Sequence, residues 1–263
     1  MGIVNLTEDS FSGDGLGAQH DRALRQAEAF IAAGVDLLDL GAESTRPGAE
    51  PVPAERELER LLPVLEALRG APVPLSVDTM KPEVMREVLR AGADLINDVA
   101  GFRLPGAIEA VAGSDCALCV MHMKGEPRTM QQSPAYEDVV AEVEAFLAQR
   151  TAALCAAGVA RERILWDPGF GFGKTPAHNA ALFRALPRLA AHQPLLVGVS
   201  RKTMIGQITG RPVGERLAGS LAAAVLAWAN GASIVRVHDV AATVDAREIL
   251  RALGPVAADG ALA

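Results

Sequence analysis

The stretch 164–175 combines a carboxylate with a loop that has almost no side chains. Its apolar start predicts a buried strand that ends on Asp167, and three glycines follow closely. Such a loop lets a flat ligand lie against backbone, with ring faces supplied by Phe170 and Phe172. The Gly-Lys-Thr ending resembles a phosphate-binding P-loop, but that motif needs a glycine where Pro168 stands. We therefore expect a ligand-binding turn, with a plain glycine-rich turn as the alternative.

Polar or ionisable residues stand at the ends of all the strands that the sequence predicts. They are Asn5, Asp39, Asp78, Asn97, His122, Asp167, Ser200 and His238. One such residue carries little information, because polar residues are common at strand ends. In a closed parallel barrel, however, all the carboxyl ends meet at one mouth, where barrel enzymes hold their active sites. The set therefore predicts a site, although Asp39 is equally compatible with a place inside the barrel.

The predicted mouth residues fall into two chemical groups. Hydrogen-bonding side chains in one plane, with apolar groups against them, suit a fused heterocycle that bears N–H, amino and carbonyl groups. This group consists of Asp78, Asn97 and Asp167, with Phe172 and Met121 against the ring face. Cations and donors suit an oxyanion such as phosphate. This group consists of Arg46, Arg236 and His238, with Lys202 at the rim. For any single cation the alternative is an exposed surface charge, and Thr45 is equally compatible with a turn.

Strands and helices alternate along the whole chain. Short buried apolar segments, typical of strands, occur at 2–6, 35–40, 74–77, 94–97, 116–121, 164–166, 195–199 and 233–237. Segments with helical spacing follow them at 21–33, 54–68, 82–90, 105–111, 136–157, 179–190, 213–230 and 241–253. This alternation predicts the α/β class, and the number of units is that of a (β/α)8 TIM barrel. We expect one domain over 1–263. The alternative is an open doubly wound sheet, whose usual Gly-x-Gly-x-x-Gly is missing here.

Composition and charge exclude several classes of function. The formal net charge is −7 and no basic run is longer than two residues, so we expect no nucleic-acid partner. The three cysteines do not suggest a disulfide framework, and Cys116 and Cys119 should point to opposite faces of one strand rather than share a metal. The longest apolar run, 221–229, is too short to span a bilayer, and no signal peptide is recognisable. These features predict a cytoplasmic protein with no membrane partner.

The residues alone leave catalysis open. Neither Ser200 nor a cysteine has a neighbouring sequence motif that would activate it as a nucleophile. A barrel that binds a planar heterocycle and an anion without catalysis, or an interaction scaffold, therefore stays open beside an enzyme.

Several segments, in order along the chain, resemble the dihydropteroate synthase family. They are GIVNLT (2–7) with DSFS (9–12), GAESTRPG (41–48), SVDT (76–79), IND (96–98), MHMKG (121–125), DPGFGFGK (167–174), GVSRK (198–202) and RVHD (236–239). Each segment alone is moderate evidence, whereas the ordered set is specific.

The resemblance implies a TIM-barrel transferase of folate biosynthesis. Members of the family join 6-hydroxymethyl-7,8-dihydropterin diphosphate to 4-aminobenzoate, and release 7,8-dihydropteroate and diphosphate. The resemblance also implies magnesium as cofactor, a homodimer and a target of sulfonamides. By motif match, the pterin is assigned to Asp78, Asn97, Met121, Asp167, Phe172, Lys202 and Arg236. The diphosphate is assigned to Asn5, Arg46, Arg236 and His238, the metal to Asn5, and the aminobenzoate to Thr45 and Ser200. The expected catalytic residues are Lys202, Arg236 and His238.

The chain departs from the family pattern around its first strand. Glu8 stands where the family usually has proline, the order Ser-Gly-Asp-Gly at 12–15 displaces Asp14 by one position, and relatives generally have residues before this strand. Two alternatives to a synthase therefore stay open: a pterin-binding paralogue with little or no activity, and a methyltetrahydrofolate methyltransferase. Lys202 within Ser-Arg-Lys and the Thr45-Arg-Pro-Gly loop argue against the methyltransferase.

Overall fold

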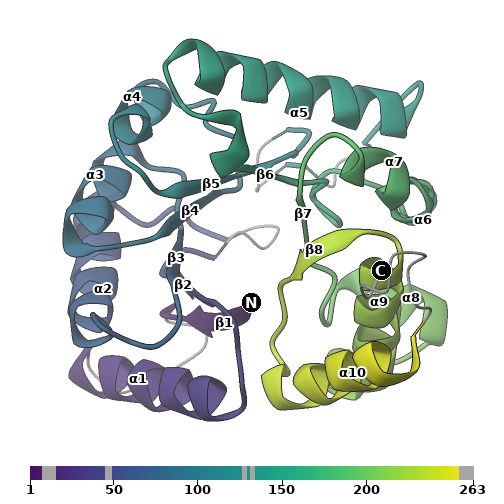
Figure 1. Ribbon diagram of the computed structural model, residues 1–263, viewed down its shortest axis with the longest axis horizontal. Coiled ribbons are helices and arrows are strands. Elements are labelled where there is room, and N and C mark those ends of the chain that lie inside the picture. Colours follow the sequence, from purple (N-terminus) through teal and green to yellow (C-terminus); the bar gives the residue numbers. More distant parts are fainter. Residues whose placement is uncertain (8–15, 45–48, 126–128, 131–133, 255–263) are drawn as a thin grey trace.

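The computed structural model describes residues 1–7, 16–44, 49–125, 129–130 and 134–254. Its centre is a sheet of eight parallel strands in chain order: β1 (Gly2–Asn5), β2 (Leu38–Gly41), β3 (Leu75–Asp78), β4 (Leu95–Asp98), β5 (Ala117–Met121), β6 (Ile164–Asp167), β7 (Leu195–Val197) and β8 (Ala232–Val235). The sheet closes because Gly2 and Val237 form a parallel bridge, and Ile3 N donates to Val237 O at 3.0 Å. The predicted (β/α)8 TIM barrel is confirmed, with its helices on the outside (Figure 1).

Helices connect successive strands around the barrel (Figure 1). They are α1 (Leu16–Ala32), α2 (Ala54–Ala67), α3 (Pro82–Ala91), α4 (Ala107–Ala112), α5 (Val139–Ala156), α6 (Pro176–Arg184), α7 (Leu186–Ala190), α8 (Thr203–Thr209), α9 (Leu217–Ala229) and α10 (Val240–Leu253). The helix expected at 179–190 is split into α6 and α7, because Pro187 has no N–H and disfavours helical backbone just before it. The helix α8 was not predicted. No described helix is both long and apolar enough to cross a membrane.

Side-chain caps fix the starts of α5 and α6, and so set where the loops before these helices end. Asp138 caps α5 by accepting from the backbone N of Val140 at 2.9 Å and of Ala141 at 3.1 Å. Thr175 caps α6 in a capping box with His178. The Gly-Lys-Thr ending is therefore the start of α6, and Pro176 occupies the first turn of that helix instead of preventing it.

Apolar side chains form two layers on opposite faces of the strands. The larger layer lies between the sheet and the helices and includes Leu118 and Trp166. The smaller layer fills the barrel interior and consists of Met1, Leu37, Leu95, Cys119 and Leu196. Cys116 belongs to the larger layer and Cys119 to the smaller one, and both thiols are free. The two cysteines therefore point to opposite faces, as their odd spacing predicted.

Candidate active site

Strand register brings polar residues of β1, β3 and β4, with a glycine of β2 between them, to one level of the barrel. Asn5 pairs with Gly41, Gly41 with Asp78, and Asp78 with Asn97. Asn5, Asp78 and Asp167 end their strands, and Asn97 stands one residue before the end of β4. Asp39 lies two residues before the end of β2 and is fully buried. It sits inside the barrel rather than at the rim, which was the alternative that the sequence left open.

Arg236 joins strands from opposite ends of the chain just below the mouth. Its Nε donates to Asp39 Oδ2 at 2.6 Å, and its Nη2 donates to Asp78 Oδ2 at 2.9 Å. Ser76 Oγ and Asn97 Nδ2 also donate to Asp39. Burial alone would lower the pKa of Arg236, but the charges of Asp39 and Asp78 outweigh it and raise this pKa. The guanidinium is therefore held charged and in one orientation.

Asp78 and Asn97 offer acceptor atoms to a ligand at this level. Burial raises the pKa of Asp78 to about 7, although the charge of Arg236 acts in the opposite direction. The Oδ1 atom of Asn97 is buried and has no hydrogen-bond partner among the described residues. Buried polar atoms are rarely left unpaired, and an exception often marks a place for a ligand or water. An N–H group on a bound ring would satisfy this oxygen.

Asp167 begins the glycine-rich loop on the other side of the mouth. Its Oδ1 accepts from Gly169 N at 2.7 Å, and burial raises its pKa against the charge of Lys202. Phe172 packs in one apolar cluster with Met121, so the structure brings these two predicted residues together. Phe170 does not face the site: it is fully buried and packs against Phe183 with ring centroids 5.7 Å apart. The expectation that both phenylalanines present ring faces was therefore wrong for Phe170.

Lys202 reaches the same loop from the end of β7. Its Nζ donates to Phe170 O and lies 4.5 Å from the centre of the Phe172 ring. Burial lowers the pKa of Lys202 to about 8, with Asp167 acting in the opposite direction. The lysine therefore contacts both the backbone of the glycine-rich loop and the Phe172 ring.

Ser200 and His238 meet at the mouth, three residues beyond the ends of β7 and β8. Ser200 Oγ accepts from the backbone N of His238 at 3.2 Å and lies 3.1 Å from its Nδ1. No sequence motif signalled this pair, because the two residues are far apart in the chain. The neighbouring Arg201 and Asp239 form a two-point ion pair that ties the same loops together.

Thr45 and Arg46, predicted for the aminobenzoate and the diphosphate, lie outside the described residues, as do Glu8 and Asp14.

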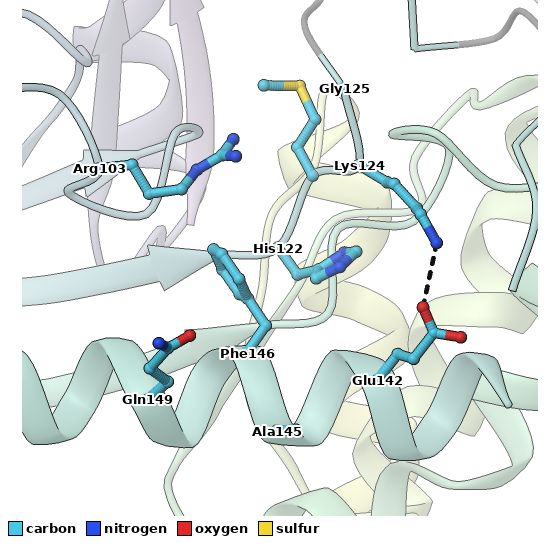
Figure 2. Close-up of a pocket in the computed structure, with 9 residues that line it drawn as sticks. Arg103, His122, Lys124, Gly125, Glu142, Ala145, Phe146 and Gln149 are labelled. Atoms are coloured by element: carbon cyan, nitrogen blue, oxygen red, sulfur yellow. Dashed lines mark hydrogen bonds and ion pairs between the residues drawn. The ribbon is translucent and has the colours of Figure 1, made fainter. Parts of the chain in front are cut away.

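A separate pocket of about 600 Å³ opens between α5 and the segment after β5. Figure 2 shows Arg103, His122 and Phe146 around it, with the Lys124–Glu142 ion pair at one end. Of the predicted strand-end residues, it contains only His122. The His122 ring meets Phe146 edge-on at 5.0 Å, and its Nδ1 lies 3.0 Å from Lys174 Nζ. His122 therefore packs toward α5, and Lys174 is a buried residue near the site to which sequence reasoning gave no role.

Comparisons with known proteins agree on one family. A family model described as "Pterin binding enzyme" matches residues 1–238. The Burkholderia cenocepacia dihydropteroate synthase complexed with 7,8-dihydropteroate is 55% identical, with a TM-score of 0.88 over 96% of this chain and 90% of that one. The Xanthomonas albilineans synthase with 4-aminobenzoic acid is 49% identical, with a TM-score of 0.90 over 98% and 93%. The Yersinia pestis synthase in a sulfonamide drug complex is 48% identical, with a TM-score of 0.91 over 96% and 92%.

The buried His122 should make folding sensitive to acid. Burial lowers its pKa to about 2, and the charge of Lys174 acts in the same direction. Below a pH of about 6.5 the unfolded chain binds a proton that the folded chain does not, so this residue weakens folding as pH falls toward the folded pKa. Wild type should therefore lose part of its stability advantage over His122→Asn as the pH falls. The difference in unfolding free energy should shrink by at most about 1.4 kcal/mol per pH unit.

Urea unfolding of both proteins between about pH 6 and pH 5 measures this slope, because Lys174, which contacts His122 and has a pKa of about 7, is largely protonated there. Burial raises the pKa of Asp78 and Asp98, so these two residues stabilise the folded chain as the pH falls. Both proteins contain them, so their effect cancels in the difference. A difference that stays constant over this range would show that His122 does not titrate on unfolding.

Proposed function

The chain belongs to the family of pterin-binding enzymes, and on this premise we propose that its barrel mouth is the active site of a dihydropteroate synthase. The reaction joins 6-hydroxymethyl-7,8-dihydropterin diphosphate to 4-aminobenzoate and yields 7,8-dihydropteroate and diphosphate. The likeness to such synthases over nearly the whole chain carries this proposal. The grouping of acceptors, cations and one ring face at a single barrel mouth agrees with it.

We assign the pterin to the acceptors and apolar groups below the rim. Asp78, Asn97 and Asp167 would accept from the N–H and amino groups along the ring edge. The unpartnered Oδ1 of Asn97 supports this assignment. Met121 and Phe172 would cover one ring face, and the Arg236 guanidinium, held by two carboxylates, would lie on the other. Lys202 would contact the ring edge beside Phe172.

We assign the diphosphate and the aminobenzoate to the rim. Arg236, His238 and Arg46 supply cations or donors for the diphosphate, while Ser200 and Thr45 would seat the aminobenzoate, the site at which sulfonamides would compete. The C–O bond between the pterin methylene and diphosphate breaks, and the electron pair leaves with diphosphate. The electron-rich dihydropterin stabilises the positive charge on the methylene, the aminobenzoate nitrogen bonds to that carbon, and its extra proton is released. This chemistry needs positioning and charge stabilisation but no protein nucleophile.

We propose magnesium as the cofactor, bound at the end of β1. A Cβ placed on Gly41 would lie 4.0 Å from Asn5 Oδ1 and 3.9 Å from Asp78 Oδ2, so both oxygens border the space that this glycine leaves open. The described residues contain no cluster of three or more histidine, cysteine or acidic side chains that could hold a metal alone. Magnesium is usually held by one or two protein oxygens together with substrate phosphates. We therefore propose Asn5 as its protein ligand, and bound there it would neutralise charge on the leaving group.

We propose that the chain forms a homodimer through the outer face of α8 and α9. Large apolar side chains are exposed on these helices and on the segment between them: Ile208, Val213, Leu217 and Leu226. Nearly all of α9 is apolar, and a helix of that kind is normally covered on most sides. The homodimer that the family resemblance implies would bury this face. We also propose a cytoplasmic location, which agrees with three free cysteines.

Turnover by the wild-type protein tests the function directly. Diphosphate release should require both the pterin diphosphate and 4-aminobenzoate, and EDTA should abolish it until magnesium is restored. Calorimetry with the pterin substrate alone separates the alternatives. Pterin binding without diphosphate release would support a non-catalytic paralogue. Methyl transfer from methyltetrahydrofolate in place of diphosphate release would support a methyltransferase.

Asp167→Asn should weaken binding of the pterin substrate by about 1–3 kcal/mol, because a charge-assisted partner becomes neutral. Asparagine keeps an oxygen for the bond from Gly169 N, so the loop should stay in place. Calorimetry measures the affinity. Asp94→Asn is the matched control, because Asp94 bonds to Leu75 N at the opposite end of the barrel. Equal affinity in wild type and Asp167→Asn would remove this carboxylate from the pocket.

Sedimentation equilibrium tests the dimer. Wild type should show twice the 27.5 kDa of one chain. Leu226→Glu places a charge on the exposed face of α9 and should give a monomer, because charges are depleted in the centres of interfaces. Leu104→Glu changes an exposed leucine in the segment between β4 and α4, away from this face, and should stay dimeric. A monomeric wild type would refute the proposal.

A further inference from the structure

Lys174 belongs to the glycine-rich stretch but has no place in the reaction described above. Only 3% of the residue is exposed. Its Nζ has four hydrogen-bond partners: Gly169 O at 2.8 Å, His122 Nδ1 at 3.0 Å, Phe172 O at 3.1 Å and His122 O at 3.3 Å. Among the described residues, all of these partners are neutral groups, since burial keeps the His122 ring uncharged.

A buried ammonium is not what stability alone would favour at this position. Burial lowers the pKa of Lys174 to about 7, although the charge of Asp167 acts in the opposite direction. Replacing a whole buried ion pair by apolar side chains of similar volume is often neutral or stabilising, so a buried charge is weak evidence for a role in stability. Three carbonyl oxygens and one ring nitrogen surround the Lys174 Nζ atom. This arrangement indicates that the lysine holds the surrounding backbone in position.

The loop that Lys174 holds lies against the backbone of the neighbouring loop. Gly169, Gly171 and Gly173 have φ values of +69°, +81° and +63°, which turn successive peptide groups. A Cβ on Gly169 would lie 1.9 Å from His122 O, and one on Gly173 would lie 2.3 Å from Lys124 O. Asn179 Oδ1 accepts from Gly171 N at 2.9 Å, and the Tyr136 hydroxyl donates to Gly173 O at 2.8 Å. The Lys174 ammonium adds bonds to carbonyls of both segments, and so ties the loop to its neighbour.

The same loop carries the proposed pterin contacts on this side of the mouth. Asp167 bonds to Gly169 N at its start, Phe172 is part of it, and Lys202 Nζ bonds to Phe170 O. A shift of the 169–173 backbone would therefore move the Phe172 ring and remove the acceptor that orients Lys202. Lys174 acts on the position of the Phe172 ring and of Lys202 through the loop carbonyls, and its charge also acts directly on Asp167 and Lys202.

We propose that Lys174 is a positioning residue for the pterin half of the mouth, which holds the 169–173 loop so that Phe172 and Lys202 face the bound ring. The inference rests on the proposed function, because it takes that ring to be a pterin. It predicts a selective effect: loss of the ammonium should impair use of the pterin substrate and leave the aminobenzoate side, near Ser200, nearly unchanged.

Lys174→Met removes the donors and keeps an unbranched chain of similar length. We expect its KM for the pterin diphosphate to rise about tenfold or more, while the KM for 4-aminobenzoate changes by less than about twofold. Urea unfolding should still give one cooperative transition, with a lower midpoint because the loop carbonyls lose their donor. Lys174→Gln, which keeps an amide donor, should fall between the two in pterin KM. Lys124→Met is the matched control: Lys124 pairs with Glu142 on the outer side of the adjacent loop and should leave both KM values unchanged (Figure 2).

A pterin KM in Lys174→Met within about twofold of wild type would overturn the proposal. Equal rises in both KM values would also overturn it, because they would indicate general damage to the barrel. If Lys174→Met does not fold, Lys174→Gln decides by the same criteria. Failure of both variants to fold would make Lys174 a stability residue and refute the positioning role.

Failure of the proposed function would look different. In that case wild type itself would release no diphosphate with both substrates present. Calorimetry with the pterin diphosphate would then decide the inference alone. Binding by wild type and about tenfold weaker binding by Lys174→Met would uphold the role of the lysine in a binding protein. Equal binding, or no binding by wild type, would refute it.

Discussion

The ion pairs of Arg236 with Asp39 and Asp78 are the interaction on which the mouth of this barrel depends. They connect the segment after β8 with β2 and β3, so three remote parts of the chain share one buried charge network. Removing one member of such a network typically costs about 3–5 kcal/mol, because the remaining charges stay buried without compensation. The network also sets the chemistry of the site. It keeps Arg236 protonated and oriented, and leaves Asp78 with a pKa of about 7 because burial opposes its ionisation.

The glycine-rich loop binds cations through its carbonyl oxygens, whereas a P-loop binds an anion through its N–H groups. In a P-loop, backbone N–H groups point at the phosphates of the ligand. Here, loop carbonyls point at two lysine ammonium groups, one from Lys174 below and one from Lys202 at the rim. Glycines with positive φ make this possible, because they turn the peptide groups and leave room for the backbone of the neighbouring loop. The anion in the proposed reaction is then left to side chains around Arg236 and His238.

A site of this construction suits a reaction in which the substrates carry their own reactivity. Diphosphate is a good leaving group once its charge is neutralised, and a dihydropterin stabilises the positive charge that develops. The protein has to hold two flat molecules in line and exclude other nucleophiles. Ser200 and His238 are in contact, which superficially resembles a nucleophile and its base, yet the Ser200 oxygen also accepts the His238 backbone N–H. That bond fits a hydroxyl that fixes a loop and presents a polar group to the second substrate.

Sequence patterns were enough to predict the class of fold and which strand ends meet at the mouth. Alternating strand and helix patterns predict a barrel, and a barrel brings strand ends such as Asp78, Asn97 and Asp167 together whatever their separation in the chain. Segment ends were less predictable: Pro187 divides one expected helix, and α8 was missed. The directions of individual side chains became clear only from the folded chain. Asp39 lies inside the barrel, Phe170 is buried behind the loop, His122 packs toward α5, and Lys174 bonds to carbonyls of the glycine-rich loop. Periodicity assigns a residue to an element, whereas packing, burial and hydrogen bonds to distant backbone fix its direction, because those partners are not neighbours in the sequence.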